Sequence, residues 1–236
     1  VSARISGAGE DDRKELARAI RRAPITVWKN LEEWQFPMVQ KDCTVVSHEV
    51  GVFNVRAGTD DLFHVLPAQE PAVEQAIRDL LRPGDTFVDA GSNIGFYTIL
   101  AAQIVGENGV VIACEMMPET AKILRGHVTL NDTAKVTVFE GALSDTSGEI
   151  IYASHPDGKH GQASIARLHA GPQLAVQTRT LESILESTEC VRVIKMDLEG
   201  AELKALIGLG ESLSKLEFLV FENRGAPEVV TWLQER

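Results

Sequence analysis

The sequence predicts an α/β fold with a mostly parallel β-sheet and helices on both of its faces. From residue 86 onward, short apolar runs alternate with helical patterns, which is the rhythm of β-α-β units. Hydrophobic residues make up 44% of the 236 residues, enough for a large core. A turn with two glycines, "DAGSNIG" at 89–95, joins the first apolar run to a helix that is apolar almost all round.

The first 81 residues lack this rhythm and are predicted to form an N-terminal α/β segment of helix and β-hairpin. Residues 10–22 begin with acids, end with bases and carry a narrow apolar stripe, which predicts a helix. We expect this helix to end before Pro24. Residues 43–55 have the β-branched content of strands, and 71–81 predict a helix that begins at a proline.

Residues 82–236 are predicted to hold the parallel sheet, with right-handed crossovers between its strands. Strands are expected at 86–90, 109–115, 135–143, 174–180, 191–200 and 216–222, with one more inside 144–154; helices are expected at 94–105, 118–131, 181–188 and 201–210. A polar stretch rich in Gly and His, residues 155–173, interrupts the rhythm. Loops of this length inside compact domains tend to be functional or mobile.

The composition argues against several classes of binding partner. The net charge is −11, and Lys and Arg do not gather in one stretch, so we expect no nucleic acid partner. No apolar run approaches the length of a membrane span, and no secretory signal is recognisable. The three cysteines, Cys43, Cys114 and Cys190, are odd in number and far apart, which favours a reducing, cytoplasmic setting and no zinc site.

The turn at 89–95 is placed where open parallel sheets bind ligands, beyond the C-terminal end of a strand. Asp89 ends the strand, Gly91 permits a tight turn, and Gly95 lets the following helix lie close. Asn93 fits because asparagine tolerates unusual backbone angles better than most residues and brings a hydrogen-bonding amide. The free N–H groups of the helix that follows favour a polar or anionic ligand, although the glycines could serve the turn alone.

A second acidic residue follows this turn at a characteristic spacing. Glu115 ends the next apolar run, twenty residues after Gly95, where nucleotide-binding sheets place an acid that grips ribose hydroxyls. A solvated strand end is the alternative for Glu115. Asp89 would repel a pyrophosphate but suits an ammonium or sulfonium group, so the residues favour S-adenosyl-L-methionine over NAD.

The chain resembles the FkbM-type S-adenosylmethionine-dependent methyltransferases over roughly residues 82–224. The resemblance is carried by "GDTFVDAGSNIGFYTILAA", "VIACEMMPE", "TLNDT", "GALSDTSGE", "QTRTLESIL", "VIKMDLEGAE" and "FLVFEN", in that order. The most specific of these is "IKMDLEGAE". The chain departs from the family at Glu182, where an aspartate is usual, and it ends at Arg236 inside the helix that precedes the family's closing strands.

The resemblance implies a Rossmann-like class I methyltransferase fold and a set of roles. Glu115 holds the ribose, and Asp197 lies beside the methyl-transfer centre. The remaining implied cofactor residues are Asp89, Gly91, Ser92, Asn93 and Gly95 in the turn, Met116 beside the adenine, and Leu143, Ser144 and Asp145 at the adenine contacts.

Methyl transfer to an alcohol needs alignment of the nucleophile and removal of a proton. In an extended strand Asp197 and Glu199 share a face with Lys195, so either carboxylate could orient the acceptor or act as the base. With Glu222 they could instead hold a divalent metal, or Glu199 could serve only the helix that follows. We expect no resident metal.

Histidine side chains are the other candidate bases. The loop contains three, His155, His160 and His169, and we take His160 as the catalytic candidate because Lys159 and Gly161 flank it. His48, His64 and His127 are expected to be structural or exposed.

The predicted activity is O-methylation of a hydroxyl on a small-molecule or carrier-tethered intermediate, with residues 1–81 as a lid on the substrate side. The family resemblance implies polyketide, glycoside or other secondary-metabolite biosynthesis. The chain begins at Val1, which fits a domain of a larger synthase and equally a fragment of a free-standing enzyme. A nicotinamide oxidoreductase, a non-catalytic cofactor-binding or structural module, and a metal-dependent methyltransferase are the alternatives.

Overall fold

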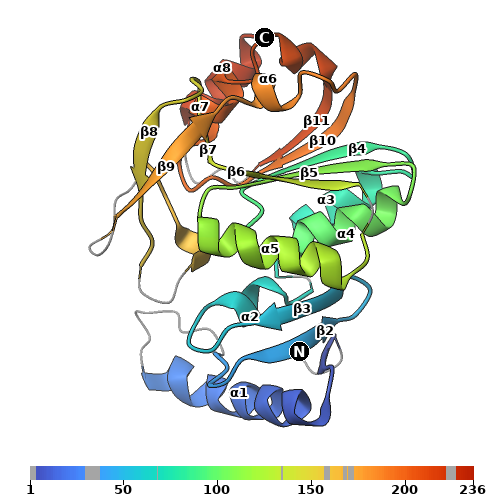
Figure 1. The fold of residues 1–236 in the computed structure, drawn as a ribbon, viewed down its shortest axis with the longest axis vertical. Coiled ribbons are helices and arrows are strands. Elements are labelled where there is room, and N and C mark those ends of the chain that lie inside the picture. Colours follow the sequence, from blue (N-terminus) through green and yellow to red (C-terminus); the bar gives the residue numbers. More distant parts are fainter. Residues whose placement is uncertain are drawn as a thin grey trace.

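A computed structural model describes residues 4–29, 38–67, 69–133, 135–156, 160–166, 169, 173–221 and 227–236; for 23–29 and 160 it describes the backbone alone. Its elements form stacked layers, with a central sheet between two groups of helices and a smaller sheet at the N-terminal end (Figure 1). No helix in the described part is both long and apolar enough to cross a bilayer.

The central sheet has five parallel strands: β4 (Thr86–Ala90), β5 (Val110–Glu115), β6 (Val136–Glu140), β10 (Val191–Met196) and β11 (Leu216–Phe221). Their order is β11-β10-β4-β5-β6. The chain first moves from β4 to one edge and then returns to the other side of β4, so the order reverses between β4 and β10. The predicted Rossmann-like sheet is therefore confirmed, and ligands bind such sheets at this reversal.

Helices cover both faces of this sheet (Figure 1). One face carries α3 (Pro71–Leu80), α4 (Phe96–Val105) and α5 (Pro118–Leu130), and the other carries α6 (Leu181–Ile184), α7 (Glu202–Ile207), η2 (Gly210–Lys215) and α8 (Pro227–Gln234). Alternate strand residues enter different cores: Phe87 and Val193 pack on the first side, Val88 and Ile194 on the second. Burial on both sides explains why these strands are continuously apolar.

The N-terminal segment contains β1 (Ile5–Gly7), α1 (Glu10–Lys29), β2 (Cys43–Ser47), β3 (Gly51–Val55) and α2 (Asp61–His64). The three strands form an antiparallel sheet in the order β1-β2-β3. The expected end of the first helix before Pro24 is wrong, because α1 continues to Lys29. A proline removes one backbone donor from a helix, which weakens it without necessarily ending it.

Two side chains, one within α5 and one directly after its last residue, attach the N-terminal sheet to the layer that covers the central sheet. The Asn131 side chain donates to the Val52 carbonyl (2.8 Å) and accepts from the Val52 N–H (2.7 Å), so it takes the place of a further strand beside β3. The His127 ring accepts from the Asn54 N–H (2.8 Å) and contacts the Ile94 carbonyl through Nδ1 (2.7 Å). These bonds fix the segment that carries α2 beside the turn at 91–95.

A third sheet holds β7 (Ala142–Leu143), β8 (Ile150–Ala153) and β9 (Leu174–Arg179), in the order β7-β9-β8. The single strand expected at 135–143 is therefore wrong, since it divides into β6 and β7 at Gly141. That glycine has φ of 145°, and a Cβ there would lie 2.8 Å from the Gln177 carbonyl oxygen. The short helix η1 (His160–Gln162) follows β8 and reaches α2.

Candidate functional site

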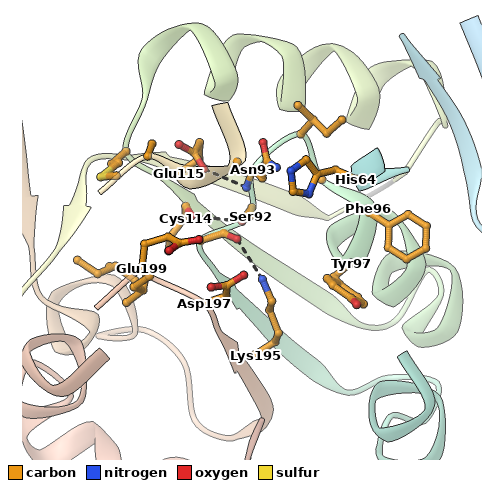
Figure 2. A pocket seen from close by; sticks show the side chains of 18 of the residues that line it. His64, Ser92, Asn93, Phe96, Tyr97, Cys114, Glu115, Lys195, Asp197 and Glu199 are labelled. Atoms are coloured by element: carbon orange, nitrogen blue, oxygen red, sulfur yellow. Dashed lines mark hydrogen bonds between the residues drawn. The ribbon is translucent and has the colours of Figure 1, made fainter. Parts of the chain in front are cut away.

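A pocket opens at the C-terminal ends of β4, β5 and β10, at the reversal of strand order (Figure 2). Its wall comes from segments far apart in the sequence: His64, 69–70, 91–97, 114–116, 141–143, Gly161, Ala163, Ile165, Lys195, 197–199 and Ala201. The turn after β4 forms its centre. The N-terminal segment, the turn and the polar loop 155–173 therefore meet at one place.

Hydrogen bonds to β5 hold the turn in shape. The N–H groups of Gly91 and Ser92 both donate to the Cys114 carbonyl (3.0 Å each), and the Ser92 hydroxyl donates to the Asp89 carbonyl (2.7 Å). Asn93 has φ of 47°, a left-handed angle, which agrees with the expectation of unusual backbone angles at this position. The Asn93 N–H donates to the Glu115 carboxylate (2.9 Å), so the turn and the end of β5 form one unit.

The two glycines of the turn are required by neighbouring protein groups as well as by their backbone angles. Gly91 has φ of 81°, and a Cβ on it would lie 1.9 Å from the carbonyl oxygen of Asp197, at the end of β10. Gly95 has φ of 96°, and its Cβ would meet Leu124 of α5 at 2.4 Å. From the sequence, Gly95 was expected to let the following helix lie close to the strand. In the structure, Gly95 instead allows α4 to lie close to α5.

Glu115 is buried at the pocket wall with both carboxylate oxygens engaged. One accepts from the Asn93 N–H and the other from the Met117 N–H (2.8 Å). Burial raises the pKa of Glu115 to about 7, against the lowering effect of these two hydrogen bonds. The group therefore changes charge near neutral pH, and any ligand that donates hydrogen bonds to it favours the ionised form.

The Asp89 carboxylate lies behind the pocket wall, which differs from the expectation that it faces the ligand. Its Oδ2 accepts from the Thr98 hydroxyl (2.6 Å), and its Oδ1 lies 3.6 Å from Nζ of Lys195. The Lys195 ammonium also donates to the Gly91 carbonyl (3.1 Å) and reaches the pocket surface. Of these two residues, Lys195 lines the pocket with its charged group and Asp89 does not.

Asp197 and Glu199 do not share the face of an extended strand, so that expectation is wrong. β10 ends at Met196, and Glu199 has φ of 51°, which turns the chain before α7. The Glu202 carboxylate accepts from the N–H groups of Leu198 (2.9 Å) and Gly200 (3.2 Å) and organises this turn. Glu202 therefore takes the helix-start role that was open for Glu199, while Asp197 and Glu199 both line the pocket.

The other expected site residues divide into two groups. Met116 and Leu143 line the pocket, whereas Ser144 and Asp145 lie outside its wall, where the Ser144 hydroxyl donates to the Asp145 carboxylate (2.9 Å). The chain leaves the pocket after Leu143, and the Ser144 N–H donates to the Arg179 carbonyl at the end of β9 (3.0 Å). Glu222 and the side chain of His160 lie outside the described part of the chain.

Sequence reasoning missed three polar groups of the pocket: His64, Glu70 and Tyr97. The Tyr97 hydroxyl donates to the Glu70 carboxylate (2.9 Å), and Nζ of Lys195 lies 5.3 Å from the centre of the Tyr97 ring. Tyr97 follows the turn directly, so its position beside the ligand site could have been inferred. Nothing in the local pattern places His64 or Glu70 here, because the N-terminal segment reaches the pocket through long-range packing.

The pocket has an apolar part and a polar part. Met116, Ala142, Ala163 and Ile165 belong to one hydrophobic cluster and all line the pocket, as does Glu115, which directly precedes Met116 in the sequence. On the polar part, Oδ1 of Asp197 is buried without a hydrogen-bond partner among the described residues. The same holds for Oδ1 of Asn93. Buried oxygens without donors are costly, so both fit a ligand that brings N–H or O–H groups.

Comparison with known proteins identifies the family. The model of the FkbM methyltransferase domain matches residues 89–236, more than half of the chain. The chain belongs to this family. The chain accordingly carries a methyltransferase domain whose cofactor is S-adenosylmethionine, a ligand with a ribose, an adenine and a cationic amino-acid end that suit the acid, the apolar cluster and the orphaned oxygens described above.

Curated relatives and solved structures share parts of the chain. It is 30% identical over 142 residues to the hexuronic acid methyltransferase AglP of Haloferax volcanii, covering 58% of this chain and 55% of AglP. The chain thus spans about half the length of that relative. The structure of methyltransferase FkbM from Methylobacillus flagellatus is 17% identical, with a TM-score of 0.39 over 66% of this chain and 41% of that one.

Among the described residues, no three His, Cys, Asp or Glu side chains are grouped as metal ligands. Asp197 and Glu199 both line the pocket, but the metal alternative also involved Glu222, which is outside the described part.

Proposed function

We propose that this methyltransferase acts on a hydroxyl oxygen of a small-molecule or carrier-tethered acceptor, such as a glycoside or polyketide intermediate. The observation that carries the proposal is the arrangement of the pocket, in which an apolar part beside Glu115 is followed by a polar part with His64, Glu70, Lys195 and Asp197. A polar part of this kind suits an acceptor with hydroxyl groups, because each of these side chains can hydrogen-bond to one.

The proposed placement of the cofactor follows from the donors and acceptors available. Met116 and Leu143 would flank the adenine, and Glu115 would accept from the ribose hydroxyls. Asn93 and Asp197, each with a buried oxygen lacking a donor, would receive the ammonium group. When bound, S-adenosylmethionine supplies an electrophilic methyl group on a sulfonium sulfur. Asp89, Gly91 and Gly95 would act indirectly by shaping the turn.

The relative AglP is named for its action on a hexuronic acid, and this supports a sugar-like acceptor for the present chain. The share of AglP that is covered leaves room for a different acceptor. Association with a larger synthase, a cytoplasmic location and the absence of a nucleic acid partner remain predictions from the sequence.

Calorimetry and product analysis test the proposal. We expect the folded protein to bind S-adenosylmethionine and S-adenosylhomocysteine and not NAD. We further expect it to release S-adenosylhomocysteine when given a panel of monosaccharides, uronic acids and their glycosides, with a methyl ether detected by mass spectrometry. A methyl group found on nitrogen or carbon, or cofactor binding without turnover of any hydroxylated compound, would contradict the O-methylation proposal.

A further inference from the structure

His64 enters the pocket from the N-terminal segment, and a buried carboxylate orients its ring. Nε2 of His64 lies 3.3 Å from Oδ2 of Asp60, one helical turn earlier in the sequence. The histidine side chain is 24% exposed and lines the pocket, whereas the Asp60 side chain is 1% exposed. In Figure 2 the His64 ring lies on the same side as Tyr97, away from Glu115.

Asp60 is held ionised and in place. Burial raises the pKa of Asp60, but the interactions with His64 and the hydrogen bonds from backbone N–H groups together outweigh that effect, so the pKa of Asp60 lies below its usual value. The Gly161 N–H also donates to Oδ2 of Asp60 (3.2 Å). The next residue, Asp61, forms a two-point ion pair with Arg56 (2.7 and 2.8 Å), so the start of α2 is fixed by side chains on both sides.

Gly161 of η1 packs directly on the imidazole. A Cβ at this position would lie 2.1 Å from Nε2 and 2.5 Å from Cε1 of His64, and 3.0 Å from Nδ2 of Asn93. The backbone of the polar loop thus fits between the histidine and the cofactor turn, and only glycine leaves room for the ring. Three separate segments therefore determine where this imidazole points.

We propose that His64 is the general base of the methyl transfer and that Asp60 is its positioning residue, a role that rests on the O-methylation proposed above. The Nε2–H group donates a hydrogen bond to Asp60, which leaves Nδ1 with its lone pair available. The acceptor hydroxyl gives its proton to Nδ1 while its oxygen forms the bond to the methyl carbon, and the sulfur keeps the electron pair of the bond that breaks. The imidazolium then releases the proton to solvent.

The other titratable groups of the pocket are less suited to this step. Lys195 is engaged as a cation with Asp89, Glu115 accepts two backbone N–H groups, and Glu70 accepts from Tyr97. Asp197 and Glu199 are carboxylates, and an ordinary carboxylate is a weaker base than imidazole by about two pKa units. Nδ1 of His64 has no hydrogen-bond partner in the described ranges, and a neutral imidazole nitrogen is the commonest general base in enzymes.

NMR of the protein without any ligand tests the arrangement independently of activity. With ¹⁵N-labelled histidine, and signals assigned by His64→Gln, we expect a neutral ring protonated on Nε2. Asp60→Asn should lower the pH midpoint of this ring by about one unit or more, because it removes the facing negative charge. A neutral ring protonated on Nδ1, or a midpoint unchanged in Asp60→Asn, would overturn the proposal.

The second test measures the methylation rate of whichever compound of the acceptor panel is a substrate. We expect His64→Gln to lower kcat by about 10²- to 10⁴-fold with S-adenosylhomocysteine affinity unchanged, and to remove the corresponding limb of the pH profile. His48→Gln is the matched control, since His48 is exposed and the side-chain hydrogen bond found for it in the described part is to the Ser6 hydroxyl (3.2 Å). If His64→Gln forms the methyl ether at the wild-type rate, His64 is not the general base, although the proposed O-methylation stands. If the product is not an ether, the proposed function itself is wrong.

A glycine pair tests the geometry without changing either member of the dyad. Gly161→Ala forces the ring away from Asp60 and should lower kcat as His64→Gln does. It should also abolish the Nε2 preference in NMR. Gly126→Ala, on an open surface of α5 with no atom within 4 Å of its Cβ, should change neither. Equal behaviour of the two alanine variants would show that the ring position is unimportant.

Discussion

Asp89 and Lys195 are direct partners on neighbouring parallel strands, and their side chains form a buried ion pair at the point where the strand order reverses. They face each other in the register of β4 and β10, with 3.6 Å between Oδ1 and Nζ. The same ammonium holds the carbonyl of Gly91, the first residue of the turn. The pair therefore connects the two strands to the loop that shapes the pocket.

Removing the lysine should be strongly destabilising. Lys195→Met leaves the Asp89 carboxylate buried with Thr98 as its remaining hydrogen-bond donor. Breaking one side of a buried ion pair costs about 3–5 kcal/mol. We expect a loss of this size in the free energy of unfolding, measured by urea titration at pH 7.

The double variant Lys195→Met with Asp89→Asn separates the ion pair from simple packing. Because the second change removes the unpaired charge, we expect it to recover a substantial part of the lost stability. If Asp89→Asn instead adds its own full cost to that of Lys195→Met, the two residues are not coupled and the buried pair does not explain the stability of the turn.

Two glycines with similar backbone angles allow a test of close approach in the turn. Gly91 (φ 81°) would place a Cβ 1.9 Å from the Asp197 carbonyl oxygen, whereas Gly84 (φ 91°) has open space. Gly84→Ala should cost about 1–2 kcal/mol from the left-handed angle alone. We expect Gly91→Ala to cost clearly more in urea unfolding and to weaken S-adenosylhomocysteine binding. Equal losses would mean that β10 yields easily and that the contact is unimportant.

Local patterns predicted the parts of the fold that local physics decides. The strand at 86–90, the left-handed angle at Asn93 and the acid at the end of β5 all follow from short-range signals: apolar runs, side-chain tolerance and spacing. The parallel direction of the strands could also be predicted, since helices between consecutive strands indicate crossover connections. These features define the turn and the acid beside it, which lie at the centre of the pocket wall.

The remainder depends on contacts between distant segments, which periodicity cannot reveal. Asp89 looks like a ligand-facing acid in the sequence, but its register partner on β10 is a lysine 106 positions away, and the two neutralise each other. His64 reaches the pocket only because His127 and Asn131 hold β3 against α5. Asp197 and Glu199 lost their expected shared face because a left-handed turn at Glu199 replaces the strand.

Cofactor affinity should depend on pH through Glu115. Burial raises the pKa of this group to about 7 in the unliganded protein, and ribose hydroxyls that donate to it would favour its ionised form. Affinity for S-adenosylhomocysteine should therefore be greatest above pH 7. It should fall by up to about tenfold per pH unit below that, with proton release on binding. Calorimetry in buffers of different ionisation enthalpy measures both quantities.

Glu115→Gln supplies the comparison for that pH dependence. An amide can still accept from the Asn93 or Met117 N–H, but it does not titrate, so the variant should bind more weakly at pH 8 and show a flatter profile. A wild-type profile that does not change between pH 6 and 8, or one that the glutamine variant reproduces, would exclude Glu115 as the titrating ribose contact.

Acidification should weaken the attachment of the N-terminal sheet through His127. Its Nε2 accepts from the Asn54 N–H (2.8 Å), which leaves Nδ1 as the donor to the Ile94 carbonyl (2.7 Å). Protonation would replace the acceptor by a second donor. Burial lowers the pKa of His127 below its ordinary value of 6.5, in spite of the two backbone contacts. The stabilisation from the neutral ring is therefore present above pH 6.5 and is lost as the pH falls below it.

The comparison of His127→Gln with the wild-type protein isolates this effect. The raised pKa of Glu115 acts in the opposite sense over the same range, since a group that keeps its proton when folded stabilises the protein as pH falls. Only the difference between the two profiles is informative. We expect the stability advantage of wild type over His127→Gln to shrink by up to about 1.4 kcal/mol per unit between pH 6.5 and 5. Parallel urea-unfolding profiles, as expected for the exposed control His48→Gln, would show that His127 does not remain neutral in the folded protein.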